Sequence, residues 1–489
     1  MDGIRKINTH FIARVVGQMC FFELPLMLIC LGVAYYYGNA LLPFALGFVL
    51  YLLTGLALYG YGLKKNNITI GRREGMLSVT ATWLVLSIVA TVPILLSPGS
   101  TNNFWTALFE TISGFTTTGA TTYAHIDDIE HSILFWRALM QWQGGIGIVV
   151  FTVALIPMLS GGAGISQVFN AETTGITHDR FLPRISDVAK RLSAVYVGIT
   201  ALLFVLLLIG PMGSFDALCH ALSTVSTGGY STRTEGILAF DSAYVEYVIA
   251  TFMFIGSLNI ALIYFLLIGK PLRLILDEEF RWFSLFILSF TAITTWWLWH
   301  NGLYSTLEET FRRAFFQCTS LGSSTGFLTA DISTWKPFFW TIALLLMFVN
   351  GCTGSTSGGM KMARFIVLVK NLRNEFKKQV RPHMLTPVIF NGRQVSISVV
   401  HQILAFCVLY VVLIFFGAAL IMLDGNGFDA SISIAVACIS NSGPGIGDYV
   451  SSVAMADDFT KFVLSFLMLA GRLEVFTFIG ILTPYFWKR

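Results

Sequence analysis

The chain has 489 residues, of which 55% are hydrophobic and only 12% are charged, and its mean hydropathy is +0.72. Soluble domains carry about 25% charged residues, so this composition excludes a soluble protein, and recurring apolar runs of about 20 residues predict an all-α polytopic membrane protein. A membrane β-barrel is excluded because its strands would alternate in polarity, and a net charge of +4 is too small to suggest nucleic-acid binding.

The N-terminus carries three basic residues, Arg5, Lys6 and Arg14, before an apolar stretch that continues to about Tyr37. No small-residue cleavage site follows, so we expect a retained first helix rather than a cleaved signal peptide. The apolar runs predict ten membrane helices, at roughly 15–36, 40–62, 76–97, 134–158, 192–210, 243–268, 283–300, 337–370, 396–422 and 459–486.

The distribution of basic residues predicts the orientation of these helices. If both termini are cytoplasmic, the inside segments hold 24 of the 31 Lys and Arg residues, as the positive-inside bias requires. Those segments are 1–14, 62–75, 159–191, 270–281, 361–393 and 487–489. The outside connections have six basic residues, which are Arg137, Arg233, Arg312, Arg313, Lys336 and Lys461. We therefore expect a multi-pass protein of the cell membrane with cytoplasmic N- and C-termini.

The outside connections contain a fourfold internal repeat. In each, an aromatic-led helical stretch precedes a short run of Ser, Thr and Gly: FTTTGATT (115–122), TVSTGGYS (224–231), GSSTGFLT (322–329) and ISNSGPGI (439–446). The shared glycines, spaced 109, 98 and 117 residues apart, are Gly119, Gly228, Gly326 and Gly443, and the leading aromatic residues are Phe104, Phe215, Phe311 and Phe428. Each interval has room for one helix into the membrane, a re-entrant helix with its loop, and one helix out.

The repeat predicts four helix–pore loop–helix units around one pore, after two extra N-terminal helices. The chain accordingly divides into an N-terminal transmembrane helix pair and four repeats, of which the first ends in a cytoplasmic linker and the third holds an intramembrane loop. The predicted limits are 1–75 for the pair and 76–191, 192–281, 282–394 and 395–489 for the repeats.

The four runs have the chemistry of a cation filter. Non-helical backbone at membrane depth is tolerated only where protein buries it or where it lines a watery cavity. Carbonyl and hydroxyl oxygens from four loops can replace the water shell of a dehydrated cation, and glycine permits the dihedrals that turn carbonyls inward. No carboxylate lies within the runs, which favours a monovalent over a divalent ion. One such run alone is more often a turn; four in register indicate a pore.

These residues resemble the Trk/Ktr/HKT superfamily of potassium transporters, and within it the TrkH/TrkG-type uptake subunits. The resemblance covers essentially the whole chain, and the extra N-terminal pair is similar to the Trk rather than the Ktr branch. Besides the four loops, the segments that carry it are QWQGGIGIVVFTVALIP (141–157), AETTGITHDRFLPRI (171–185), GCTGSTSGGMK (351–361) and GRLEVFT (471–477).

The resemblance implies a function and a set of site residues. Glycine in all four loops is the pattern associated with potassium rather than sodium, so potassium, or rubidium in its place, is the expected substrate. The implied selectivity filter consists of Thr117, Thr118, Gly119, Ser226, Thr227, Gly228, Ser324, Thr325, Gly326, Asn441, Ser442 and Gly443. The fourth loop departs from the Thr-Gly pattern, which affects only the equivalence of its hydroxyl.

The resemblance also implies two protein partners. It predicts a homodimer and a separate cytosolic, ring-forming, nucleotide-binding regulatory subunit that docks on the basic inside face. The predicted cytoplasmic segments do not exceed about 33 residues, which leaves no room for a nucleotide-sensing domain within the chain.

The segment 351–361 has four glycines and must break the apolar span around it. A phosphate-binding loop is disfavoured because Met360 follows the second glycine of Gly354-x4-Gly359 and no strand precedes it; a simple kink or cytoplasmic turn remains an alternative. We expect an intramembrane loop, to which the resemblance assigns the role of gate. The predicted gate residues are Gly351, Gly354, Ser355, Thr356, Ser357, Gly358, Gly359, Lys361 and Arg472.

Two ionisable residues fall within predicted spans, where a charge is costly and usually faces a cavity or a partner. Arg472 is expected to face the pore and raise the barrier to a cation; the alternative is a salt bridge to a pore-helix carboxylate such as Glu110. Glu474 cannot pair with Arg472 on one helix face. Glu23 is expected to have a packing or helix-contact role.

No enzymatic function and no covalent cofactor are predicted. The eight histidines lack ligand spacing, and the seven cysteines are scattered through apolar stretches as packing residues. The competing functions are a sodium-permeable or cation-coupled carrier built on the same repeats, an alternating-access carrier with inverted repeats, and a scaffold with vestigial loops. Inverted repeats are disfavoured because all four glycine loops lie on one side.

Overall fold

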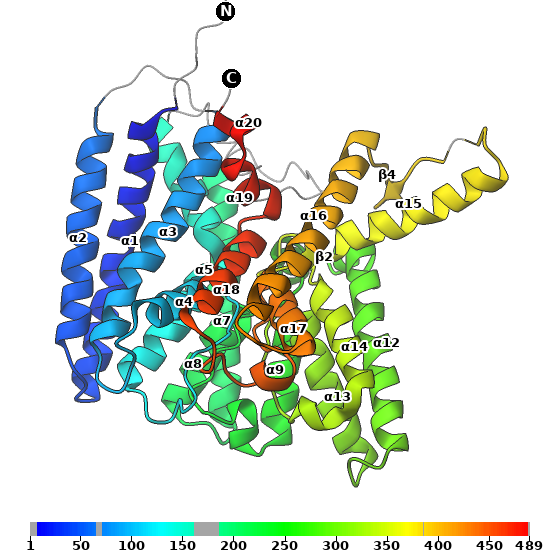
Figure 1. Ribbon diagram of the computed structural model, residues 1–489, viewed down its shortest axis with the longest axis horizontal. Helices are drawn as coiled ribbons and strands as arrows, with labels where there is room; N and C mark the ends of the chain where they lie inside the picture. Colours follow the sequence, from blue (N-terminus) through cyan, green and yellow to red (C-terminus); the bar gives the residue numbers. More distant parts are fainter. Residues whose placement is uncertain (1–6, 65–70, 161–184, 385, 488–489) are drawn as a thin grey trace, which may run out of the picture.

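The computed structural model describes residues 7–64, 71–160, 185–384 and 386–487, which form a helical bundle with two short two-stranded sheets (Figure 1). In this described part, six helices are long and apolar enough to cross a membrane, and two bent helix pairs would raise the number to eight. The predicted polytopic helical architecture is confirmed. The six helices are α1 (Thr9–Tyr36), α2 (Leu42–Gly62), α3 (Arg72–Leu96), α7 (Ile185–Ile209), α12 (Glu278–His300) and α16 (Ile397–Met422).

The N-terminal helices α1 and α2 lie side by side at one edge of the molecule (Figure 1). Small residues permit their close approach: a Cβ on Gly17 would lie 2.7 Å from the backbone nitrogen of Tyr59, and a Cβ on Gly62 would lie 2.6 Å from the Cβ of Arg14. Helix α1 also packs against the first repeat, on α3 and α5. The pair therefore supports the pore region from one side.

Each repeat consists of a spanning helix, a short pore helix, a loop and a second helix. The first helices are α3, α7, α12 and α16, and the pore helices are α4 (Phe104–Phe115), α8 (Ser214–Val225), α13 (Leu307–Gly322) and α17 (Phe428–Ile439). The second helices are α5 (His131–Ser160), α9 (Ala243–Gly256) with α10 (Ile260–Leu267), α14 (Lys336–Phe348) with α15 (Met362–Val380), and α18 (Asp458–Arg472) with α19 (Val475–Leu482). Two pore helices begin at a side-chain cap: Asn103 accepts a hydrogen bond from Trp105 N at 2.8 Å at the start of α4, and Thr306 accepts one from Glu309 N at 3.2 Å at the start of α13.

Two predicted spans are broken, although the sequence indicated continuous helices. The span predicted at 243–268 bends by 108° between α9 and α10, and the span predicted at 459–486 bends by 119° between α18 and α19. Asn259 begins α10 by accepting a hydrogen bond from Ala261 N at 2.9 Å, and Glu474 separates α18 from α19 with a φ of 64°. Helix α5 also contains one non-helical residue, Gly147. Thus the second helix of each repeat is interrupted. The sequence had predicted such a break only in the third repeat.

The remaining elements are short. They are α11 (Leu272–Ile275), α20 (Pro484–Trp487), the 3-10 turns Gly236–Phe240, Ile332–Trp335 and Gly447–Tyr449, and the strands β1 (Val349–Asn350), β2 (Met360–Lys361), β3 (Ile389–Phe390) and β4 (Arg393–Gln394). The predicted repeat limits at 76, 192 and 282 fall just inside α3, α7 and α12. In Figure 1 the start of α1, the projecting helix α15 and α20 lie at one end of the molecule, as a common side for both termini requires.

Candidate functional site

The four predicted loops share an uncommon backbone conformation. Each contains two residues of positive φ separated by one residue. Side chains rarely tolerate this conformation, which persists where the surroundings over-determine it and often marks a functional site. The first members are Thr117, Thr227, Ser324 and Asn441, with φ of 53°, 52°, 60° and 54°, and the second members are Gly119, Gly229, Gly326 and Gly443, with φ of 80°, 83°, 83° and 87°.

The shared glycine of the second loop is Gly229, and the prediction of Gly228 was wrong by one residue. Gly228 takes the place of Thr118, because each donates its backbone N–H to the carbonyl five residues earlier, at 2.8 and 2.9 Å. The predicted site residue Ser226 consequently lies one position before the equivalent residues of the other loops. The sequence offered two adjacent glycines, and only the backbone distinguishes them.

The four loops close into a ring, which we define as residues 117–119, 227–229, 324–326 and 441–443. A side chain on each shared glycine would place its Cβ less than 3.0 Å from a backbone carbonyl oxygen of the next repeat, closer than real Cβ atoms come. The contacts run from Gly119 to Gly228, from Gly229 to Thr325, from Gly326 to Ser442, and from Gly443 back to Thr118. Because the fourth contact returns to the first loop, the repeats surround one axis in chain order.

The ring presents neutral oxygen atoms. Its side chains are hydroxyls and one amide, all buried, and no charged residue is among them. Each pore helix ends at the ring, so the negative ends of four helix dipoles are directed at it. Backbone carbonyls in such a setting suit a dehydrated monovalent cation.

The predicted break in the third repeat is a loop that packs against the ring. Strands β1 and β2 pair in parallel and close residues 351–359 into the intramembrane loop. The hydroxyl of Thr227 donates to that of Thr356 at 3.2 Å, and the backbone N–H of Gly358 donates to the Ser324 hydroxyl at 2.9 Å. The loop thus contacts the second and third ring segments directly. The other predicted gate residues of this region, Gly351, Gly354, Ser355, Ser357, Gly359 and Lys361, lie in the loop or in β2.

Arg472, at the end of α18, joins the intramembrane loop to the first repeat. Its Nη1 donates to the carbonyl oxygen of Thr356 at 2.7 Å, and its Nη2 donates to the carbonyl oxygen of Gly144 in α5. The alternative partner considered from the sequence, Glu110, is bound elsewhere. Arg472 therefore lies where it can hold the loop in position beside the ring.

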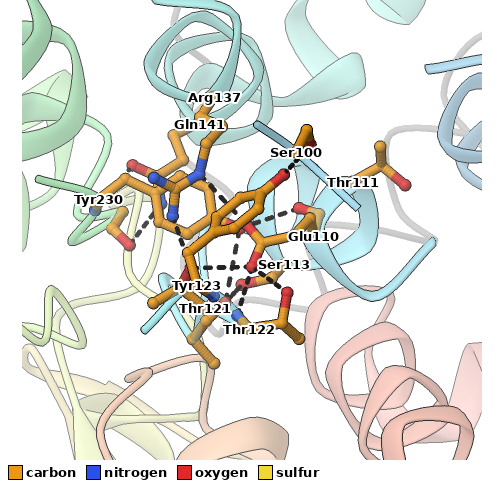
Figure 2. A network of polar contacts seen from close by, with 12 residues as sticks. Ser100, Glu110, Thr111, Ser113, Thr121, Thr122, Tyr123, Arg137, Gln141 and Tyr230 are labelled. Carbon is orange, nitrogen blue, oxygen red and sulfur yellow. Dashed lines mark hydrogen bonds and ion pairs between the residues drawn. The ribbon is translucent and has the colours of Figure 1, made fainter. Parts of the chain in front are cut away.

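Glu110 is the centre of a buried polar network behind the first loop (Figure 2). Its carboxylate accepts hydrogen bonds from the Thr121 hydroxyl at 2.8 Å and from Thr122 N at 2.5 Å, and it pairs with Arg137 at 3.2 Å. The guanidinium of Arg137 lies over the ring of Tyr230, 3.9 Å from its centroid. Arg137, which the sequence placed among outside residues, is buried, and the network joins loops 1 and 2.

The second loop has a smaller brace. Asp216, in the first turn of α8, accepts hydrogen bonds from the Thr232 hydroxyl at 2.7 Å and from Arg233 at 2.8 Å. Burial would raise the pKa of Asp216, but the hydrogen bonds from Arg233 and Thr232 outweigh it and hold that pKa below its usual range. Asp216 is therefore a carboxylate at neutral pH.

Two further buried carboxyl groups join separate elements, and the sequence analysis had not singled out the second, Glu279. Glu23, expected to have a packing or helix-contact role, accepts a hydrogen bond from the side-chain amide nitrogen of Gln143 at 2.7 Å, so it joins α1 to α5. Glu279 of α12 accepts hydrogen bonds from Thr353 N at 2.7 Å and Ala363 N at 2.9 Å, which fixes both ends of the intramembrane loop. Glu23 was visible as an acidic residue inside an apolar run, whereas Glu279 lies among the charged residues of 277–281 and gave no such signal.

Comparison with known proteins gives one consistent result. The family model TrkH, described as a cation transport protein, matches residues 44–483. The Trk system potassium uptake protein TrkH of Salmonella typhimurium is 34% identical over 98% of this chain and all of its own length, and TrkG of Escherichia coli is 32% identical over 99% of this chain and all of its own. The crystal structure of the potassium transporter TrkH from Vibrio parahaemolyticus superposes with a TM-score of 0.88 at 29% identity, covering 98% of this chain and 99% of that one.

Proposed function

The chain belongs to the TrkH family of cation transport proteins, and from this premise we propose that it is a potassium-selective uptake channel of the cell (inner) membrane. Its full-length relatives bear the name of potassium uptake proteins. The observation that carries the proposal is the closed ring of four loops, with neutral oxygens around one axis. Residues 171–184, which make up all but the last residue of another segment that carries the resemblance, lie outside the described residues.

We assign selectivity to the twelve ring residues. A permeating potassium ion exchanges water for carbonyl oxygens, and the helix dipoles of α4, α8, α13 and α17 offset part of the dehydration cost. The contacts between neighbouring repeats fix how far apart the carbonyls lie. A ring held at fixed spacing discriminates between cations by the fit of its oxygens, without any acidic side chain.

We assign gating to the intramembrane loop together with Arg472. The loop touches two ring segments, and its glycines and hydroxyls allow a second arrangement at small energetic difference. The guanidinium that binds Thr356 adds a positive charge to the ion's path, and its repulsion weakens when water fills the cavity. In this proposal the loop and Arg472 move together when the channel opens.

The proposed partners are a second copy of the chain and a cytosolic, ring-forming, nucleotide-binding regulator. Helix α15 continues directly from the intramembrane loop and projects from the bundle (Figure 1). It carries basic residues near its end, including Lys377 and Lys378. A protein that binds this helix has a short mechanical route to the loop. Part of the proposed docking face, residues 161–184, lies outside the described residues.

Rubidium uptake in cells that lack other potassium uptake systems tests the proposal. Cells expressing the chain should grow at low potassium and accumulate rubidium in preference to sodium. Gly326→Val, which forces a side chain into the ring, serves as the matched control and should abolish uptake at equal membrane levels. Equal rubidium and sodium uptake would favour the sodium-permeable alternative, and uptake that requires a proton or sodium gradient would favour the coupled carrier.

A further inference from the structure

Three of the four loops share a side-chain device that the second loop lacks. In repeats 1, 3 and 4, two hydroxyl groups two residues apart bond to each other just before the shared glycine. The pairs are Thr116 and Thr118 at 2.8 Å, Ser323 and Thr325 at 2.7 Å, and Ser440 and Ser442 at 3.0 Å. In the second loop the equivalent positions hold Ser226 and Gly228, so no such pair can form.

A glutamine from the first repeat occupies this place. Gln141 of α5 is fully buried and its Nε2 donates to the carbonyl oxygen of Gly228 at 2.6 Å. Its Oε1 accepts hydrogen bonds from the Ser223 hydroxyl at 2.7 Å and from Tyr230 N at 3.2 Å. Figure 2 shows Gln141 beside Tyr230 and Arg137, at the edge of the Glu110 network. All these contacts converge on the second loop.

Gly228 and Gln141 depend on each other sterically. Gly228 does not have a positive φ, so its backbone does not require glycine. A Cβ at this position would instead overlap the Cδ and Oε1 atoms of Gln141. The extra glycine of the second loop is therefore the space that Gln141 fills, which explains why this loop reads Gly-Gly where the first and third read Thr-Gly.

We infer that Gln141 is a positioning residue that determines selectivity at the second ring segment, in place of the hydroxyl pair used by the other three. The inference rests on the proposed filter function. The Gly228 carbonyl that Gln141 holds is also the one that contacts Gly119, so its position sets the spacing between the first and second loops. Without Gln141 that carbonyl loses its buried donor, and the second loop and the end of α8 together lose three hydrogen bonds.

A double-mutant cycle tests the inference in purified protein reconstituted into liposomes. Gln141→Ala should lower the ratio of rubidium to sodium flux by about fivefold, equivalent to about 1 kcal/mol of discrimination. Gly228→Ser should lower it similarly because the new side chain displaces Gln141. The double variant should return to within about twofold of the unchanged chain, because the new serine can pair with Ser226 as Ser440 pairs with Ser442.

The inference is overturned if the losses of the rubidium-to-sodium flux ratio add in the double variant, or if Gln141→Ala leaves that ratio unchanged. The proposed function stands in either case, provided that the chain without substitutions still selects rubidium. Gln317→Ala is the matched control: Gln317 is equally buried, but its amide atoms have no hydrogen-bond partner among the described residues, so its loss should not alter the ratio. Thermal unfolding of the same variants in detergent gives a readout independent of transport. There, Gln141→Ala should rescue Gly228→Ser, and additive destabilisation also overturns the inference.

Discussion

Replacing Gly229 with alanine separates the two possible registers of the second loop. Gly229 has a φ of 83°, and its Cβ would collide with the Thr325 carbonyl oxygen of the next repeat. A Cβ on Gly228 would meet a glutamine side chain instead. Side chains can shift more easily than a backbone carbonyl fixed in a closed ring. The alanine at 229 should therefore be the more damaging to selectivity.

The expected magnitude follows from two terms. Alanine at positive φ costs about 1–2 kcal/mol in folding stability, and the second and third loops must separate by about 1 Å before the Cβ and the carbonyl oxygen are 3.0 Å apart. Misplacement of a positioned group by about 1 Å can cost on the order of 100-fold in function. We expect the ratio of rubidium to sodium flux to fall by at least about tenfold.

The assay is ion flux in liposomes, with the amount of folded protein measured by size-exclusion chromatography. Gly302→Ala is the matched control, because Gly302 also has a positive φ, 63°, but a Cβ there would meet nothing within 4 Å. It carries the backbone cost without the collision and should leave the flux ratio unchanged. A Gly229→Ala channel as selective as the unchanged chain would refute the ring geometry, and greater damage from Gly228→Ala would restore the register predicted from sequence.

Three further predictions concern the proposed gate, the membrane topology and the brace that Asp216 forms at the second loop. Arg472→Ala removes the link between Thr356 and α5 and should raise basal cation flux severalfold without any regulator; unchanged or lower flux in folded protein would place the constriction elsewhere. A cysteine at Lys378, in a background without native cysteines, should react with an impermeant maleimide only from the cytoplasmic side, and labelling of intact cells would contradict the orientation. Asp216→Asn should lower thermal stability at neutral pH. Because the folded-state pKa of Asp216 lies below its ordinary value of about 3.9, the difference in stability between the two proteins should begin to shrink as the pH falls through that ordinary value and should be lost as the pH falls through the lowered pKa; a difference that stays constant or grows as the solution is acidified would contradict the assignment.

The sequence was most informative where one physical property extends over many residues. Length and apolarity located α1, α2, α3 and α16 closely, because a membrane demands a continuous apolar helix. The repeat was visible because four loops need the same small residues. The breaks at 257–259 and 473–474 were not, because hydropathy continues through them and the bends depend on individual contacts, such as the cap supplied by Asn259.

Partners of buried charges were the least predictable part of the site. Arg472 binds backbone carbonyls rather than a carboxylate, and backbone carbonyls leave no trace in a sequence. Glu110 is neutralised by Arg137, which the sequence analysis counted among the basic residues of the outside connections. The prediction of the register of the second loop failed for a related reason, since the role of Gly228 depends on Gln141, 87 residues away in the chain.

The closure of the ring means that the site is complete only when the fourth repeat meets the first. The contact that closes the ring joins the fourth repeat to the first: the Asn441 amide donates to the Thr118 hydroxyl at 2.9 Å, across 323 residues of the chain. While the ribosome is still making the fourth repeat, the first three can enter the bilayer but face an open gap where α17 and its loop belong. A nascent or truncated chain therefore has no smaller working version of the site, and this late, non-local step is the kind that slows folding.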